Sequence, residues 1–144
     1  MMISTKGRYA LRVMIDLAEH NSGSYIPLSD IAKRQEISEK YLESIVSTLS
    51  KNGLVDALRG KGGGYKLNRE PENYTVASIL KVTEGSLAPV ACLDTTSNSN
   101  KCTRASQCKT LAMWKNLQKV IDDFFEGITI ADLMDHEPVS DYII

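Results

Sequence analysis

The sequence predicts a mainly α-helical protein with one small β-hairpin. Apolar residues recur at helical spacing over most of the 144 residues, whereas residues 54–67 read as strand, glycine-rich turn and strand. A second long apolar repeat begins after residue 111, beyond a polar segment that holds all three cysteines. We therefore expect a helical domain that carries the hairpin, followed by a long helix.

Three short helices are expected before the hairpin, each opened by a residue that favours a helix start. Ser4 or Thr5 opens the first helix, Pro27 the second and Ser38 the third. The apolar stripes that pack them together are Ala10, Val13, Met14, Leu17 and Ala18; Leu28, Ile31 and Ala32; and Leu42, Ile45, Val46 and Leu49.

Polar residues mark the ends of these helices. His20 is expected to cap the first helix rather than to bind a metal. Lys33 and Arg34 place positive charge in the last turn of the second helix, which the helix dipole favours. Asn52 and Gly53 end the third helix, because glycine adopts a left-handed cap without strain.

The hairpin has a pliant and basic tip. Strands are expected over residues 54–59 and 65–67, and the four glycines between them remove every Cβ that would hold the backbone away from a partner. Arg59, Lys61 and Lys66 supply positive charge. On its own, such a hairpin could also be a solvated turn without a partner, rich in glycine only because of its backbone geometry. Directly after three short helices, it completes a winged helix-turn-helix, in which the third helix enters the DNA major groove.

The outer face of the third helix has side chains suited to that role. They are short or charged groups that can approach a phosphate or a base edge, namely Lys40, Glu43, Ser44, Ser47 and Lys51. A fourth helix, capped by Thr75 and ending near Gly85, supports this domain. Its buried residues are expected to be Val76, Ile79 and Leu80.

The last long helix is expected to form a dimer. Its apolar residues alternate by threes and fours, a spacing typical of helices that pack along another helix. They are Trp114, Leu117, Ile121, Phe124 and Ile128, widened by Met113, Val120 and Phe125, some of which we expect to pack on the chain's own domain. The alternative is a core helix within one subunit. A last helix should begin at Thr129, since Asp132 completes a capping-box spacing.

Composition agrees with a cytoplasmic DNA-binding protein. The chain is 42% hydrophobic and 24% charged, as in globular proteins, and its apolar runs are too short for a transmembrane helix or a signal peptide. Residues 1–69 carry 11 Lys and Arg against 7 Asp and Glu, whereas residues 70–144 carry 6 against 11. A basic first half indicates a polyanionic partner.

Four motifs resemble a known family. They are STKGRYA (residues 4–10), KYLE (40–43), KNGLV (51–55) and RGKGGGY (59–65). Together they resemble the winged-helix repressor family that includes IscR, NsrR and CymR, with the greatest similarity to the iron-sulfur cluster regulator IscR. The similarity covers almost the whole chain.

The resemblance implies a homodimeric transcriptional repressor that binds palindromic double-stranded DNA. In this family the third helix and the wing touch DNA, which places Lys40, Glu43 and Ser44 in the major groove and Arg59 and Lys61 on the wing. It also implies three parts: residues 1–85 for DNA binding, 86–110 for a cysteine-containing loop, and 111–144 for the dimerisation helix and tail.

Two further residues and one departure complete the expected DNA interface. Lys6 and Tyr9, in the first motif, are expected to reach the DNA backbone. IscR carries Ser and Gln where this chain has Lys40 and Ser44, so the base sequence that is recognised need not be the same.

The resemblance also gives the cysteines a role. Three cysteines of this loop hold an iron-sulfur cluster in IscR and NsrR, and Cys92, Cys102 and Cys108 are the candidates here. Either a [2Fe-2S] or a [4Fe-4S] cluster is compatible with three thiolates. CymR-type members lack this triad, which argues against that subgroup.

The expected fourth ligand is missing from its usual places. Leu111 stands where IscR has a histidine, and the residues around Lys6 and Arg8 include no acidic side chain of the kind that NsrR uses. Asp94, His136 or an exogenous small molecule are the alternatives.

Three other functions place different demands on the sequence. A cluster-free thiol switch that regulates cysteine or sulfur metabolism needs only the thiols, whereas structural zinc needs a nearby fourth ligand that the segment does not offer. An enzyme would require a nucleophile, a base and oxyanion donors at matching spacing, which this sequence does not suggest. The glycine-rich tip also lacks the Lys-Ser/Thr end of a phosphate-binding loop.

Overall fold

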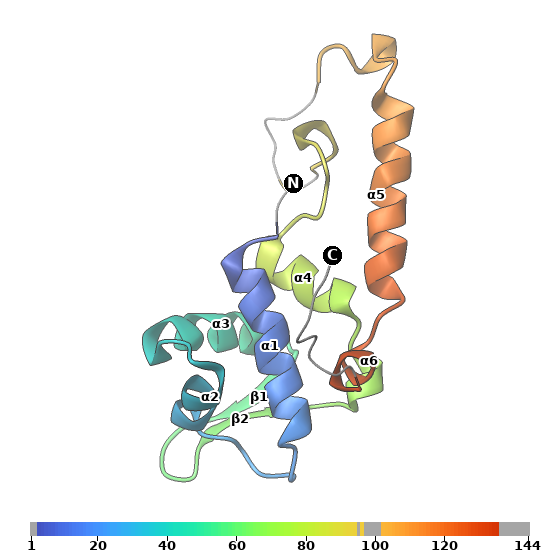
Figure 1. Ribbon diagram of the computed structural model, residues 1–144. Helices are drawn as coiled ribbons and strands as arrows, with labels where there is room; N and C mark the ends of the chain where they lie inside the picture. The colour runs from blue at the N-terminus through green and yellow to red at the C-terminus, as the bar shows by residue number, and fades with distance from the viewer. Residues whose placement is uncertain (1–2, 95, 97–101, 136–144) are drawn as a thin grey trace.

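The computed structural model describes residues 3–94, 96 and 102–135, and it confirms the expected order of helices and hairpin (Figure 1). Helices α1 (Thr5–Glu19), α2 (Leu28–Gln35) and α3 (Glu39–Lys51) precede strands β1 (Val55–Leu58) and β2 (Gly64–Leu67). Helices α4 (Val76–Glu84), α5 (Leu111–Glu126) and α6 (Ile130–Met134) follow, with short 3-10 turns at Pro71–Asn73, Ala91–Leu93 and Ala105–Gln107.

The predicted caps are present. The hydroxyls of Ser4, Ser38 and Thr75 accept backbone N–H groups in the first turns of α1, α3 and α4. Thr129 and Asp132 form a reciprocal capping box at the start of α6. His20 is the C-cap of α1, as expected.

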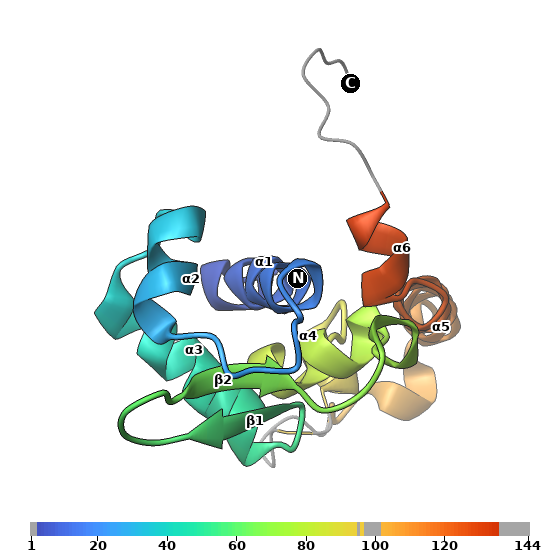
Figure 2. The same ribbon diagram turned by 90° about the horizontal axis from the view of Figure 1, so that it is seen from below.

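The core lies between α1 and the elements that surround it (Figure 2). The apolar stripes of α1 and α3 are buried as predicted, and Tyr74 and Ile130 are fully buried with them. Ile130 belongs to α6, so the chain returns to the core of the winged-helix domain after α5. We call α1 to α4, the hairpin and α6 the body.

A buried ion pair fastens α1 to the end of α2. The Asp16 carboxylate is 1% exposed and accepts from Arg34 Nε at 3.0 Å, Arg34 Nη2 at 2.8 Å and Gln35 Nε2 at 2.8 Å. Burial alone would raise the pKa of Asp16, but the hydrogen bonds from Arg34 and Gln35 outweigh it and lower the pKa. Arg34 therefore does more than complement the helix dipole, because it compensates a charge in the core.

The wing is a two-stranded antiparallel hairpin whose inner strand is paired on both edges. Val55 lies opposite Leu67 and Leu58 opposite Gly64. Beyond β2, Ile26 and Tyr65 exchange backbone hydrogen bonds of 2.8 and 2.9 Å. Gly64 has a φ of 152°, and a Cβ there would collide with the carbonyl of Ile26. Glycine is therefore required where the wing meets the segment before α2.

The described residues between 86 and 126, which we call the arm, stand away from the body (Figure 1). Near the base of the arm, a second apolar cluster joins α4 to α5 through Val76, Leu80, Leu87, Ile121 and Phe125. Within the described ranges, no helix has both the length and the apolar character needed to cross a membrane.

Candidate DNA interface and cysteine segment

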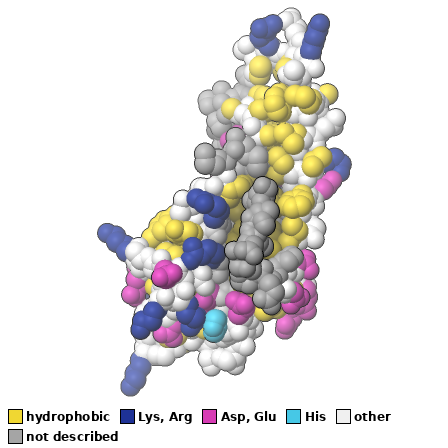
Figure 3. Space-filling view, in the orientation of Figure 1, with side chains coloured by type: hydrophobic (Ala, Val, Ile, Leu, Met, Phe, Trp, Pro, Cys, Tyr) yellow, Lys and Arg dark blue, Asp and Glu magenta, His cyan; other side chains and the backbone are white. Residues whose placement is uncertain are grey.

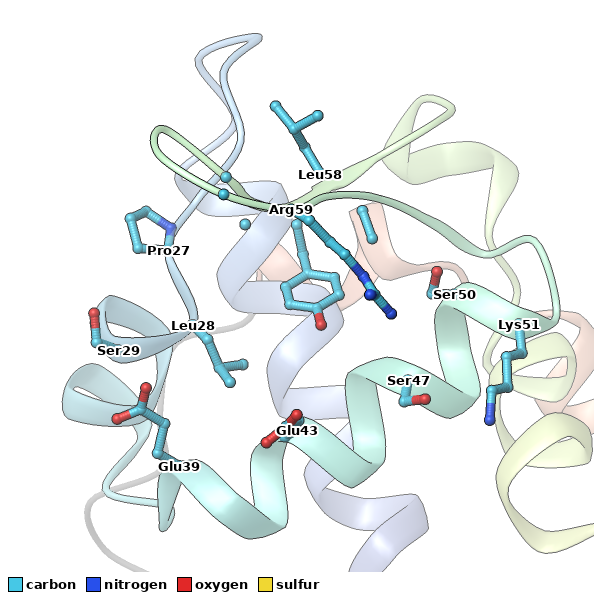
Figure 4. Close-up of a pocket in the computed structure, with 15 residues that line it drawn as sticks. Pro27, Leu28, Ser29, Glu39, Glu43, Ser47, Ser50, Lys51, Leu58 and Arg59 are labelled. Carbon is cyan, nitrogen blue, oxygen red and sulfur yellow. The ribbon is translucent and has the colours of Figure 1, made fainter.

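A groove of about 840 Å³ runs between α3 and the wing (Figure 4). One wall is the outer face of α3, and Arg59, directly after β1, extends from the other side toward it. Pro27, directly before α2, and Ser29, in its first turn, close one end. The groove thus lies where the recognition helix of a winged helix-turn-helix meets its wing.

The charges along the groove change sign from one end of α3 to the other. Glu39 and Glu43 lie toward the start of the helix, and Lys51 lies in its last turn. Arg59 faces the same space (Figure 4). Carboxylates can accept hydrogen bonds from the N4 amino group of cytosine, while Arg and Lys bind phosphates or guanine. The groove therefore has side chains that could bind the base edges of DNA and others that could bind its phosphates.

The predicted DNA-contacting residues are distributed over this region. Glu43 and Arg59 line the groove, whereas Lys40, Ser44 and Lys61 are exposed but lie outside its lining. The lining also includes Glu39, Ser50 and the strand residues Ala57 and Leu58, which sequence reasoning did not single out. Glu39 carried a readable signal, since an acidic first-turn residue directly follows the Ser38 cap.

Lys6 and Tyr9 are both engaged within the protein. Lys6 Nζ donates to Thr48 Oγ1 of α3 at 2.9 Å. The ring of Tyr9 packs edge-to-face on Tyr41 with centroids 5.8 Å apart, and the guanidinium of Arg12 lies 4.9 Å above it. These contacts tie α1 to α3, so both residues help to position α3.

The three cysteines lie in the segment between α4 and α5, and all three are exposed free thiols. Cys92 belongs to the 3-10 turn Ala91–Leu93, and Cys108 is the C-cap of the turn Ala105–Gln107. The Cys108 Sγ lies 3.4 Å from Thr110 Oγ1, and hydrogen bonding to Thr110 lowers the pKa of the thiol. Accessible thiols are the donor set that iron-sulfur clusters require.

The geometry of this segment does not gather its ligands. Among residues 3–94, 96 and 102–135, no three Cys, His, Asp or Glu side chains lie close enough together to hold a metal ion. The Asp94 carboxylate accepts from the backbone N–H of Thr96 at 2.8 Å, and bonds from Thr96 lower its pKa. Ligation by Asp94 would have to replace these bonds. His136 lies outside the described residues.

Helix α5 presents two apolar faces. On the inner face, Ile121 and Phe125 pack on the second apolar cluster, as does Ile128 just after the helix. The expected packing of Phe125 on the chain's own domain is therefore confirmed. The outer face is exposed and consists of Met113 (52%), Leu117 (39%), Val120 (63%) and Phe124 (61%). Figure 3 shows hydrophobic side chains gathered along the arm, above the Lys and Arg side chains of the body.

Comparison with known proteins is decisive for the family. Residues 3–136 match the Rrf2 family, which is described as an iron-dependent transcriptional regulator. The chain belongs to the Rrf2 family. Its relatives are transcriptional regulators and not enzymes, which confirms the predicted class of DNA-binding regulator.

Named Rrf2 relatives match nearly the whole chain. The HTH-type transcriptional regulator IscR of Erwinia tasmaniensis is 36% identical over 139 residues, which cover 96% of this chain and 82% of that protein. The structure of CymR, the global cysteine regulator of B. subtilis, has a TM-score of 0.74 at 33% identity and covers 96% of this chain and 99% of its own. The structure of T. potens IscR has a TM-score of 0.69 at 35% identity, and the match covers 93% of this chain and 86% of that one.

Proposed function

We propose that this Rrf2 regulator is a cytoplasmic homodimeric repressor that senses iron-sulfur cluster status through Cys92, Cys102 and Cys108. The observation that carries the proposal is three exposed thiols in one segment, attached to a winged-helix body. The similarity to IscR proteins over 96% of the chain supports the same assignment.

The DNA-binding part of the proposal rests on the groove between α3 and the wing. Lys40, Glu43 and Ser44 would enter the major groove of a palindromic operator, while Arg59 and Lys61 would flank it. All five side chains are exposed on the described surface. Lys6 and Tyr9 would contribute at the backbone from the first turns of α1.

The sensing part rests on the chemistry of the cysteine segment. Cys92, Cys102 and Cys108 would provide three thiolates, and the fourth ligand would come from Asp94, His136 or a small molecule. When bound, an iron-sulfur cluster would make the protein responsive to oxidants, nitric oxide and iron shortage. Among the described residues the three thiols do not form one ligand group, so cluster binding would bring them together.

The cysteine segment is connected to the body at both of its ends. Leu87, at the base of the arm, is 5% exposed and packs with Val76 and Leu80 of α4. Helix α5 begins three residues after Cys108, and its inner face packs on the same cluster. The outer face would form the dimer, so the segment lies where the spacing of two recognition helices can be set.

Anaerobic purification followed by a visible spectrum and by iron and sulfide analysis tests the sensing role. A coloured protein is expected, and its chromophore should disappear in Cys102→Ala. Ser106→Ala, an exposed substitution in the same segment, is the matched control and should keep the colour. A colourless, iron-free protein after cluster reconstitution would instead favour a thiol switch, for which Cys108 with its lowered pKa is the first candidate.

DNA binding is tested on a palindromic duplex that the protein itself selects from a randomised library. Arg59→Ala should weaken binding by about tenfold, and affinity should fall steeply as salt increases. Glu72→Ala, an exposed change remote from the groove, serves as the control. Binding that does not depend on salt would contradict phosphate contacts by α3 and the wing.

A further inference from the structure

Helix α4 ends in a carboxylate that closes the first turn of α1. Glu84 is the last residue of α4, and its Oε1 accepts from the backbone N–H of Ser4 at 2.9 Å and from Ser4 Oγ at 2.7 Å. Ser4 is the N-cap of α1, and its hydroxyl in turn accepts from Gly7 N at 3.2 Å. Helix α1 has no acidic residue in its own first turn. Glu84 therefore supplies the negative charge that a helix N-terminus favours.

The sequence of α1 makes room for this carboxylate. Gly7 is buried inside the first turn of α1, and a Cβ at this position would collide with Glu84 Oε1. Glycine is otherwise a poor choice within a helix. The close approach of Glu84 gives a physical reason for it.

The same turn of α1 holds the recognition helix. Lys6 lies between Ser4 and Gly7, and its ammonium donates to Thr48 Oγ1 at 2.9 Å. The Thr48 hydroxyl donates onward to the carbonyl of Ser44 at 3.1 Å, within α3. One turn of α1 thus bonds to the end of α4 on one side and to α3 on the other.

The end of α4 is also where the arm begins. Gly85, with a φ of 79°, ends the helix directly after Glu84. Leu87 then enters the second apolar cluster, where Ile3, next to Ser4, packs as well. A displacement of the arm's base would therefore move Glu84 through the backbone, and Ser4 through the packing of Ile3 against Leu87 and its neighbours.

We propose that Glu84 is a positioning residue for DNA binding. By holding Ser4, it fixes the first turn of α1, and through Lys6 and Thr48 it sets the position of α3 relative to the base of the arm. The inference rests on the DNA-reading role of α3 in the proposed function. Beyond that function, it assigns the contacts that connect the arm to α3.

Equilibrium binding of the full-length protein to the self-selected duplex tests this role. Glu84→Ala should weaken binding about fivefold, the effect of one lost hydrogen-bonded contact, whereas Glu84→Gln keeps the accepting oxygen and should stay within about twofold of wild type. Glu72→Ala also removes an exposed carboxylate, outside the contacts of α1 with α3 and α4, and should bind normally. Melting temperatures of all variants are measured alongside, and binding is assayed well below them.

Gly7 provides an independent perturbation of the same contact. Gly7→Ala should displace the carboxylate and weaken binding about as much as Glu84→Ala does, by about fivefold. In the Glu84→Ala background the collision is gone, so adding Gly7→Ala should change the affinity by less than about twofold. Thr48→Val should likewise be non-additive with Glu84→Ala.

Each outcome decides between the two proposals. A lower melting temperature with unchanged affinity would make Glu84 merely structural and overturn the inference, as would additive effects of Gly7→Ala and Glu84→Ala. Arg59→Ala is the reference variant. If it weakens binding and Glu84→Ala does not, the positioning role alone fails, whereas normal binding by both would reject the DNA interface itself.

Discussion

Helices α1 and α5 have nearly equal lengths, 15 and 16 residues, yet α1 has seven buried residues and α5 has none. Both are amphipathic, and both carry apolar residues at helical spacing. The difference is in their surroundings, since α1 is enclosed by α2, α3, α4 and α6, while α5 packs along one face only. A helix gains most of its stability from tertiary packing, and the proposed dimer would give α5 a second surface that the described part of one subunit does not provide.

This contrast separates two kinds of substitution. Changes in the body should alter the free energy of unfolding of each subunit. Changes on the outer face of α5 should alter association and leave the fold of the subunit intact. The predictions below test that separation.

The largest effect is expected for Phe124→Glu on the outer face of α5. A carboxylate placed without a partner in an apolar interface should weaken the dimer by about 4 kcal/mol, about a thousandfold in its dissociation constant. Light scattering measures the mass, and Asn116→Glu, an exposed residue of the same helix, is the charge-matched control. An unchanged mass in Phe124→Glu would mean that this face is not the interface. Ile121 is a poorer probe because it packs on α4.

Ile130→Ala should have the largest effect in the body. The side chain is fully buried in the main core although it lies beyond the arm, and truncation should cost about 3 kcal/mol of unfolding free energy. Urea denaturation measures the change, and Ile130→Val should cost about 1 kcal/mol. If Ile130→Ala costs no more than a surface substitution, α6 is not part of the body's cooperative unit.

Asp16→Asn should cost about 2 kcal/mol at neutral pH, because it removes the charge that compensates Arg34. The pKa of Asp16 is lowered on folding, so its ionised form stabilises the native state above pH of about 4. This contribution is lost as pH falls through the folded-state pKa. In urea titrations between pH 7 and 3, the difference in stability between the two proteins should therefore narrow toward the acid end. A constant difference would contradict the role of the charge.

Tyr74→Phe should have the smallest effect, about 1 kcal/mol. The Tyr74 hydroxyl donates to the carbonyl of Leu54 at 2.8 Å and accepts from Asn68 N at 3.0 Å, which joins the base of the wing to the turn before α4. Burial raises the pKa of the phenol. Thermal melts should show the loss, and the dimer mass should not change. A change in mass would indicate that body and arm are less separate than their packing suggests.

Much of the fold could be predicted because its signals are local. Ser4, Ser38 and Thr75 each accept a hydrogen bond from a backbone N–H three residues later. Glycines of the wing adopt positive φ angles, which other residues rarely adopt. Such signals depend on neighbours in the chain.

What the sequence did not reveal depends on distant partners. Asp16 and Arg34 each resemble surface charges until the fold brings them together, although an aspartate between Val13 and Leu17 on a buried stripe was a hint. The role of Glu84 likewise needs residues from 80 positions earlier. The division of α5 into inner and outer faces needs the position of α4.

In the candidate sites, too, one part could be predicted from the sequence and another could not. Glu43 and Arg59 could be placed together because a wing follows its recognition helix in a known order. The arrangement of the cysteines could not, since a segment of Ser, Thr and Asn has no periodicity that fixes its path.

The pairing of Ile26 with Tyr65 bears on how such a regulator can be redesigned. With β2 bonded on both edges, the wing and the segment before α2 form one unit, and Gly64 leaves no clearance between them. A wing taken from another family member would therefore be expected to function only if residues 26–27 were transplanted with it. New operator preferences would be selected more readily at the exposed positions of α3, where side chains can change without disturbing this joint.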